Sequence, residues 1–272
     1  MQSNSALRTL RDQGIGLTVS TVEACLEAIG VHRPRALLLL GHMRSGSTLL
    51  LHLLMTNPEV SAVGERGAVY ASKADFARLA LVTRILRGLP LRRLRYVVDQ
   101  INHSQLTPDT SLLQSSRVRV LFILRRPEAS IASILELYHT YYPEPWTPAR
   151  AVDYYAERLE TLAKLGESLP SPTVAALIPY ELLTESPVEM LEALRVFLGL
   201  SRGFSQTYDT YSFTGKYGDP GPKIALGRID RPERATDIQL SAIDIKRATE
   251  AYLKCHATLA RFALPSLKSA PA

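Results

Sequence analysis

The sequence predicts an α/β fold of three layers, in which helices flank a central parallel β-sheet. Residues 35–41 and 118–124 are apolar without polar alternation, which is typical of strands buried on both faces of a sheet. Segments with helical periodicity alternate with the expected strands along the chain. This alternation favours a parallel sheet covered by helices on both sides.

The N-terminal half begins with the capping box Ser20-Thr-Val-Glu23, which predicts a helix that Gly30 ends, in a helical extension of residues 1–30. The buried strand at 35–41 follows, then a loop and a leucine-rich helix that Asn57-Pro58 ends. The remaining elements expected in this half are a strand at 60–63, a helix at 71–86 from its periodicity, and a β-rich strand at 96–101.

The C-terminal half follows the strand at 118–124 with a helix that Pro127 opens, because proline suits the first helical position. An amphipathic helix is expected at 148–168, a strand at 173–178, and a helix at 187–198 that Gly199 stops. Residues 211–234 are rich in Gly, Pro and charge and predict a long loop before a helix at 238–262. Without an internal repeat or a clear linker, we expect one domain over residues 1–272.

Composition narrows the function classes. The chain has 272 residues, a net charge of +6, and two cysteines at opposite ends, which favours a cytoplasmic protein with reduced thiols. No apolar run exceeds five residues, so no membrane anchor is expected. The positive charge suits an anionic ligand. Because the sequence has no zinc-finger spacing and no run of five like charges, we do not expect nucleic acid to be the partner.

The segment Gly41-His-Met-Arg-Ser-Gly-Ser-Thr48 lies between the first buried strand and a helix. It matches the phosphate loop G-x-x-x-x-G-K-[ST] except that Ser47 stands at the lysine position. Glycines let the main-chain N–H groups turn inward, and the helix N-terminus adds positive potential. ATP- and GTP-dependent phosphoryl transfer uses the missing lysine. The loop therefore predicts a P-loop-like anion site in which Arg44 supplies the cation.

Three motifs in order make the chain resemble the sulfotransferases that use 3′-phosphoadenosine 5′-phosphosulfate (PAPS). The first is Arg44-Ser-Gly-Ser-Thr48, the second is Arg125 with Ser133 eight residues later, and the third is Tyr180-Glu-Leu-Leu-Thr-Glu-Ser-Pro187. The resemblance implies that PAPS is the co-substrate and that no metal is needed. The residues that it assigns to the donor are Arg44, Ser45, Gly46, Ser47, Thr48, Arg125, Ser133 and Tyr180. Lys216 and Lys223 lie where the family often has a basic loop over the nucleotide.

Sulfuryl transfer needs a base for the acceptor proton and a cation for the leaving phosphate. Arg44 suits the second role. For the base, the resemblance offers Glu65, near the glutamate of carbohydrate-modifying relatives, and His103, near the histidine of the cytosolic branch, where Asn102 is an alternative equivalent. Gln100 stands in place of that branch's lysine. Glu65 is slightly preferred, although a structural pairing with Arg44 or Arg66 is its alternative.

The function predicted is transfer of a sulfuryl group from PAPS to a hydroxyl or amine of a small-molecule or carbohydrate acceptor. Two alternatives remain at this point. One is a small-molecule kinase with a degenerate phosphate loop, and the other is a nucleotide-binding protein without catalysis. The sequence gives no oligomeric state.

Overall fold

The computed structural model describes residues 33–88, 94–216, 219–230 and 240–264. In this part of the chain, five parallel strands form a sheet in the order β2-β3-β1-β4-β5, so the predicted three-layer α/β fold is confirmed. The strands are β1 (Arg35–Leu40), β2 (Val60–Ala62), β3 (Tyr96–Ile101), β4 (Val118–Leu124) and β5 (Ala175–Pro179).

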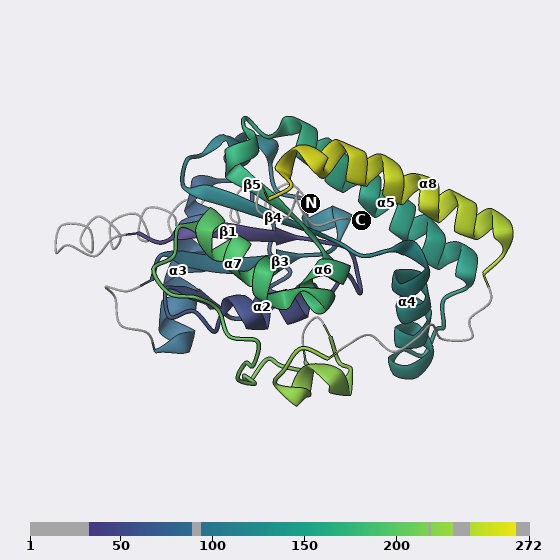
Figure 1. Ribbon diagram of the computed structural model, residues 1–272, viewed down its shortest axis with the longest axis horizontal. Coiled ribbons are helices and arrows are strands. Elements are labelled where there is room, and N and C mark those ends of the chain that lie inside the picture. The colour runs from purple at the N-terminus through teal and green to yellow at the C-terminus, as the bar shows by residue number, and fades with distance from the viewer. Residues whose placement is uncertain (1–32, 89–93, 217–218, 231–239, 265–272) are drawn as a thin grey trace, which may run out of the picture.

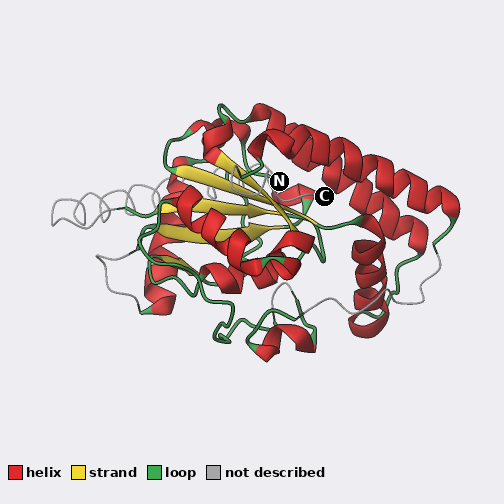
Figure 2. Cartoon of the chain, viewed as in Figure 1, coloured by secondary structure: helices red, strands yellow, loops and turns green. Residues whose placement is uncertain are grey.

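Helices cover both faces of the sheet (Figure 1). The helices are α2 (Ser47–Leu54), α3 (Lys73–Arg87), α4 (Pro127–Tyr141), α5 (Pro148–Ser168), α6 (Tyr180–Glu185), α7 (Pro187–Leu198) and α8 (Ala242–Leu259). Apolar residues of α3, α4, α5 and α8 form a core on one face, and those of α2, α6 and α7 form a core on the other. Figure 2 shows the strands between these groups of helices, with the long helices α5 and α8 side by side.

The central strand β1 explains why the apolar residues do not alternate with polar ones. Leu38 and Leu40 point into the core beneath α5, whereas Leu37 and Leu39 point into the core beneath α2. All four side chains are fully buried, because successive residues of a strand face opposite sides. The strand thus ends in the middle of the sheet, with its carboxyl end between those of β3 and β4.

Element boundaries depart from the predictions at a few places. Helix α3 begins at Lys73, two residues late, because the Ser72 N–H donates to the Asp75 carboxylate 2.8 Å away in a capping box. Strand β5 also begins two residues late, after a 3₁₀ turn at Pro172–Val174. Helix α6 was not predicted, because six residues give little periodicity. The helix expected at 20–29 lies outside the described residues. The helix expected at 238–262 begins later, at Ala242 after the N-cap Ser241, and its last residues, 260–262, form a 3₁₀ turn.

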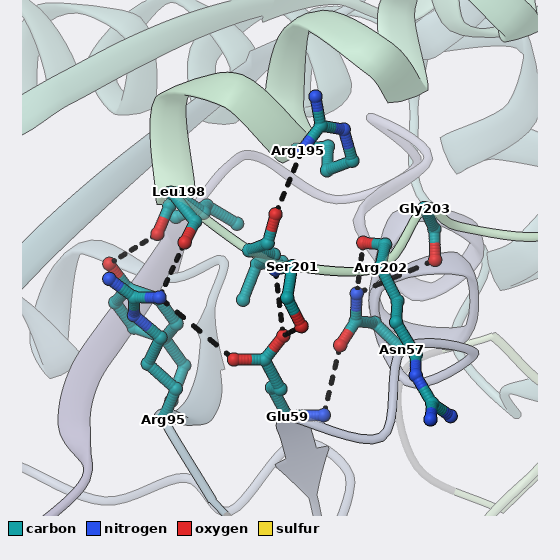
Figure 3. A network of polar contacts seen from close by, with 11 residues as sticks. Asn57, Glu59, Arg95, Arg195, Leu198, Ser201, Arg202 and Gly203 are labelled. Carbon is teal, nitrogen blue, oxygen red and sulfur yellow. Dashed lines mark hydrogen bonds and ion pairs between the residues drawn. The ribbon is translucent and has the colours of Figure 1, made fainter.

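At the amino edge of the sheet, polar groups bind one another (Figure 3). Glu59 precedes β2 and accepts from the Ser201 N–H at 2.9 Å and from its hydroxyl at 2.6 Å. Asn57 donates to the Arg202 carbonyl at 2.6 Å, and the Arg95 guanidinium donates to the Gly199 carbonyl. These bonds join the starts of β2 and β3 to the chain that leaves α7.

None of the described helices combines the length and apolar character that crossing a membrane requires.

Candidate active site

The phosphate loop connects the end of β1 to the first turn of α2. Gly46 has φ +88°, and a Cβ there would lie 2.2 Å from the Tyr180 ring, so both conformation and space require glycine. Arg44 also has a positive φ, of 63°. A non-glycine residue in this conformation costs roughly 1–2 kcal/mol, and such strain is typical of functional sites. The loop therefore presents a charged side chain at a position that glycine would occupy with less strain.

Arg44 connects two of the sequence-predicted motifs. Its Nε donates to the Ser133 hydroxyl of α4 at 2.8 Å. Its Nη1 pairs with the Asp219 carboxylate at 2.5 Å. The structure thus brings the phosphate loop and the residue eight positions after Arg125 into direct contact, on the same edge of the sheet.

Arg125 follows β4 and contacts the phosphate loop. Its Nη1 donates to the Arg44 carbonyl at 3.1 Å, and its guanidinium lies 4.5 Å from the centre of the Tyr180 ring. Burial is the main cause that lowers the pKa of Arg125, although an arginine stays charged at neutral pH. Tyr180 therefore fits between Gly46 and Arg125 and fixes both, as a cation–π partner can.

Glu65 lies where β2 and β3 end. Its Oε2 accepts from Gln100 Nε2 at 3.1 Å and from Asn102 Nδ2 at 3.4 Å, so its hydrogen bonds come from amides. Gln100 Nε2 also lies 3.4 Å from the Thr48 hydroxyl, which links Glu65 to the phosphate loop. Burial, and next the charge of Asp99, raise the pKa of Glu65 to about 7.

His103, the other candidate base, follows β3 and is half-buried. Its ring centre lies 6.0 Å from that of Tyr154, and burial followed by the charge of Arg158 lowers its pKa. His42 is fully buried beside the strand ends, where its Nδ1 binds the Met43 carbonyl and its Nε2 accepts from the Arg125 N–H. Burial lowers the pKa of His42 to about 3, so this imidazole is neutral.

The segment between α7 and α8 contacts the site through Asp219, which the sequence did not predict. Lys216 and Lys223, predicted to contact phosphate, are both exposed, and Lys223 Nζ lies 3.8 Å from Asp230. Asp219, between them in sequence, is the residue that contacts Arg44.

Sequence reasoning also missed Arg158. This residue of α5 is 1% exposed. It donates from Nε to the Gly41 carbonyl and from Nη2 to the Ile101 carbonyl, each at 2.8 Å. Burial lowers the pKa of Arg158 to about 10. It joins the carboxyl ends of β1 and β3. The available signal was its place on the apolar face of the amphipathic helix, between the buried residues Tyr155 and Leu162.

Several buried polar atoms at this edge lack a hydrogen-bond partner among the described residues. They are Ser45 Oγ, Gln100 Oε1, Asn102 Oδ1, Arg125 Nε and Arg158 Nη1. Buried polar atoms are rarely left unpaired. Both hydrogen-bond donors and hydrogen-bond acceptors therefore lie beside the phosphate loop without a partner among the described residues.

Comparison with known proteins gives a match in structure and none in sequence. No family model matches the chain, and no curated protein matches it. Among the solved structures that match are two that cover 81% of the chain. One is a sulfotransferase domain from the olefin synthase of Synechococcus PCC 7002, with a TM-score of 0.56, 16% identity and 95% of that domain covered. The other is a sulfotransferase domain from the curacin biosynthetic pathway, with a TM-score of 0.53, 17% identity and 98% covered.

The chain therefore has the P-loop-like α/β fold of sulfotransferase domains. The family resemblance noted from Arg44–Thr48, Arg125 and Ser133 agrees with this fold.

Proposed function

We propose that this protein is a sulfotransferase that moves a sulfuryl group from PAPS to a hydroxyl or amine of a small-molecule or carbohydrate acceptor. The observation that carries the proposal is the contact of Arg44 with Ser133 and of Arg125 with the Arg44 carbonyl. It joins two anion-binding segments at one edge of the sheet. A donor with phosphate groups at both ends of a nucleoside matches such a pair of segments.

The residues present fit this donor. Main-chain N–H groups and hydroxyls of Ser45–Thr48 would hold its sulfated end at the N-terminus of α2. Arg125 and Ser133 would hold the other phosphate, since a guanidinium can bind phosphate bidentately. Arg125 Nε and Ser45 Oγ lack partners among the described residues, which supports their availability. Tyr180 would keep Arg125 in place, and Lys216 and Lys223 would add charge from the neighbouring loop.

Glu65 would act as the base. PAPS, when bound, supplies the sulfuryl group and a phosphate leaving group. As the acceptor oxygen or nitrogen bonds to sulfur and the bond between sulfur and the 5′-phosphate oxygen breaks, the Glu65 carboxylate would take the proton of the acceptor. Arg44 would stabilise the negative charge on the leaving 5′-phosphate. A carboxyl with a pKa of about 7 is a suitable base near neutral pH.

His103 is the second candidate for this role. Glu65 is favoured because Gln100 lies within reach of both its carboxylate and the Thr48 hydroxyl, whereas the ring contact of His103 is with Tyr154 on α5. A Glu65→Gln variant should lose sulfuryl transfer by at least about 100-fold while still binding nucleotide. The same loss in His103→Gln with an active Glu65→Gln variant would assign the base to His103 instead.

The decisive experiment is a transfer screen with ³⁵S-labelled PAPS against sugars, phenols, amines and lipids, beside the same screen with ATP and magnesium. Labelled product from PAPS supports the proposal, and product from ATP alone would favour a kinase. Nucleotide binding without turnover of any acceptor would favour a non-catalytic protein.

A binding measurement tests the donor site directly. The double variant Arg125→Ala, Ser133→Ala should bind 3′-phosphoadenosine 5′-phosphate about 100-fold more weakly in calorimetry, because charge-assisted hydrogen bonds to phosphate are lost. The neighbouring Arg126→Ala is the matched control, because Arg126 is exposed and should leave affinity unchanged. Full affinity in the double variant would contradict the proposed donor site.

A further inference from the structure

Asp99 is a buried acid that the chemistry above does not use. It lies in β3, pairs in register with Leu38 of the central strand, and has no exposed surface. An ionised carboxylate in such a place is costly unless it is hydrogen-bonded. The groups that donate hydrogen bonds to Asp99 therefore indicate its role.

The hydrogen bonds of Asp99 hold the segment that carries Glu65. Its Oδ2 accepts from the Tyr70 hydroxyl at 2.5 Å. Its Oδ1 accepts from the main-chain N–H of Arg66 at 3.3 Å and from that of Gln100 at 2.9 Å. Both ends of the segment 66–70 are thus attached to one carboxylate, directly after Glu65.

Strand β3 also holds the Glu65 side chain. Gln100 and Asn102, two residues apart, point to the same side and donate to its carboxylate. Asp99, on the other side of the strand, fixes the main chain next to it. The consecutive residues Asp99 and Gln100 therefore hold the main chain directly after Glu65 and the Glu65 carboxylate, respectively.

Charged groups from several elements surround this pair of acids. Asp99 of β3 opposes the ionisation of Glu65, and Arg158 of α5 favours it. The charge of Glu65 is one of the causes that raise the pKa of Tyr154 of α5. Tyr70 and Arg66 lower the pKa of Asp99, and Asp75 of α3 raises the pKa of Tyr70. Burial raises the pKa of Asp99 to about 6, so at neutral pH its carboxylate is mostly ionised beside Glu65.

We infer that Asp99 is a positioning residue: its hydrogen bonds hold the segment that follows Glu65 against β3, and its carboxylate sets a negative charge beside that segment. This inference rests on the proposed function in taking Glu65 as the base. The hydrogen bonds of Asp99 are present whether or not sulfuryl transfer occurs.

The test is a ¹³C NMR titration of the Glu65 carboxyl, assigned from the spectrum of Glu65→Gln, in the wild type and in Asp99→Asn. Asparagine can accept from both N–H groups and donate to Tyr70, so it removes the charge and keeps the contacts. The midpoint should move to lower pH in Asp99→Asn. Asp75→Asn makes the same change in a nearby acid without contact to Glu65 and should leave the midpoint in place. An unmoved or higher midpoint in Asp99→Asn overturns the inference.

A reciprocal measurement covers the case in which Asp99→Asn does not fold. Two interacting acids share their titration steps, so the Asp99 carboxyl of the wild type should show a second, smaller step at the midpoint of Glu65, and Glu65→Gln should lose that step. A wild-type Asp99 titration without the second step overturns the inference.

Kinetics separate this inference from the proposed function. The pH profile of kcat should rise at lower pH in Asp99→Asn than in the wild type. A shifted NMR midpoint in a protein without any transferase activity would refute the proposed function and leave the role of Asp99 intact. Transfer activity with an unshifted pH profile in Asp99→Asn would refute the role of Asp99 and leave the proposed function intact.

Discussion

The two edges of the sheet treat polar groups in opposite ways. At the amino edge, Glu59, Asn57 and Arg95 bind groups that follow α7 (Figure 3). At the carboxyl edge, buried atoms of Ser45, Asn102 and other residues have no partner among the described residues. Polar groups that hydrogen-bond one another stabilise a fold. Buried polar groups without a partner cost stability, but they can bind a ligand. The comparison favours a stabilising role for the amino edge, and it agrees with the binding role proposed for the carboxyl edge.

The pKa shifts of two glutamates show the same difference. Burial opposes ionisation of Glu59, but hydrogen bonds from Ser201 outweigh it and lower the pKa. Burial and Asp99 raise the pKa of Glu65 to about 7. Folding therefore favours the charged form of Glu59 and the protonated form of Glu65.

The largest effect is expected for Arg44→Gly, which separates binding from stability. Affinity for 3′-phosphoadenosine 5′-phosphate should fall by about 30- to 100-fold, because a charge-assisted contact is lost. The free energy of unfolding should stay the same or rise by up to about 1 kcal/mol, because glycine relieves the positive φ. Calorimetry and urea unfolding measure the two quantities. If Arg44→Gly kept normal affinity and lost much stability, Arg44 would have a structural role like that of Glu59 at the amino edge.

Glu59→Ala should have the opposite result. It removes the acceptor of two Ser201 hydrogen bonds, so the free energy of unfolding should fall by about 2 kcal/mol, with unchanged nucleotide affinity. Glu192→Ala is the matched control, because the Glu192 side chain is exposed and ion pairs at the surface contribute little to stability. Loss of nucleotide affinity in Glu59→Ala would contradict the view that the amino edge contributes to stability alone.

The smallest of the three free-energy changes is expected in the stability of Glu65→Gln, and it depends on pH. The folded pKa of Glu65 is raised, so the wild type gains stability from Glu65 only while the acid is protonated, and loses it between about pH 4.5 and 7. Glu65→Gln should therefore be more stable than the wild type at pH 8, by about 1 kcal/mol, or 2–4 °C in Tm. Near pH 4.5 the two should melt alike. Thermal melts at both pH values measure the difference, and destabilisation at pH 8 would contradict the raised pKa.

The sequence predicted most of the fold because its signals are local. Strands 35–41 and 118–124 are continuous apolar runs, and the phosphate loop lies between a strand and a helix, as its motif requires. It also predicted that Arg44, Arg125 and Ser133 belong to one site, and the structure brings these residues together. Their roles, the acceptor and the cellular location stay predictions.

The residues that sequence reasoning missed depend on distant partners. Asp99 is a charged residue in the buried strand β3, and Arg158 is a charged residue on the buried face of α5. Neither sequence pattern indicates that Asp99 holds the Glu65 segment or that Arg158 joins the ends of β1 and β3. Asp219 lies 175 residues from Arg44, and a separation of this kind leaves no periodicity to detect.

The ion pair between Arg44 and Asp219 has a consequence for any anion that enters the site. The incoming anion must compete with a carboxylate attached to the protein, so weakly charged solutes such as chloride are disfavoured relative to multivalent ones. Added salt screens both the internal pair and the incoming contact. Affinity for a multivalent nucleotide should therefore decline less steeply with ionic strength than it would at an arginine without a counter-ion.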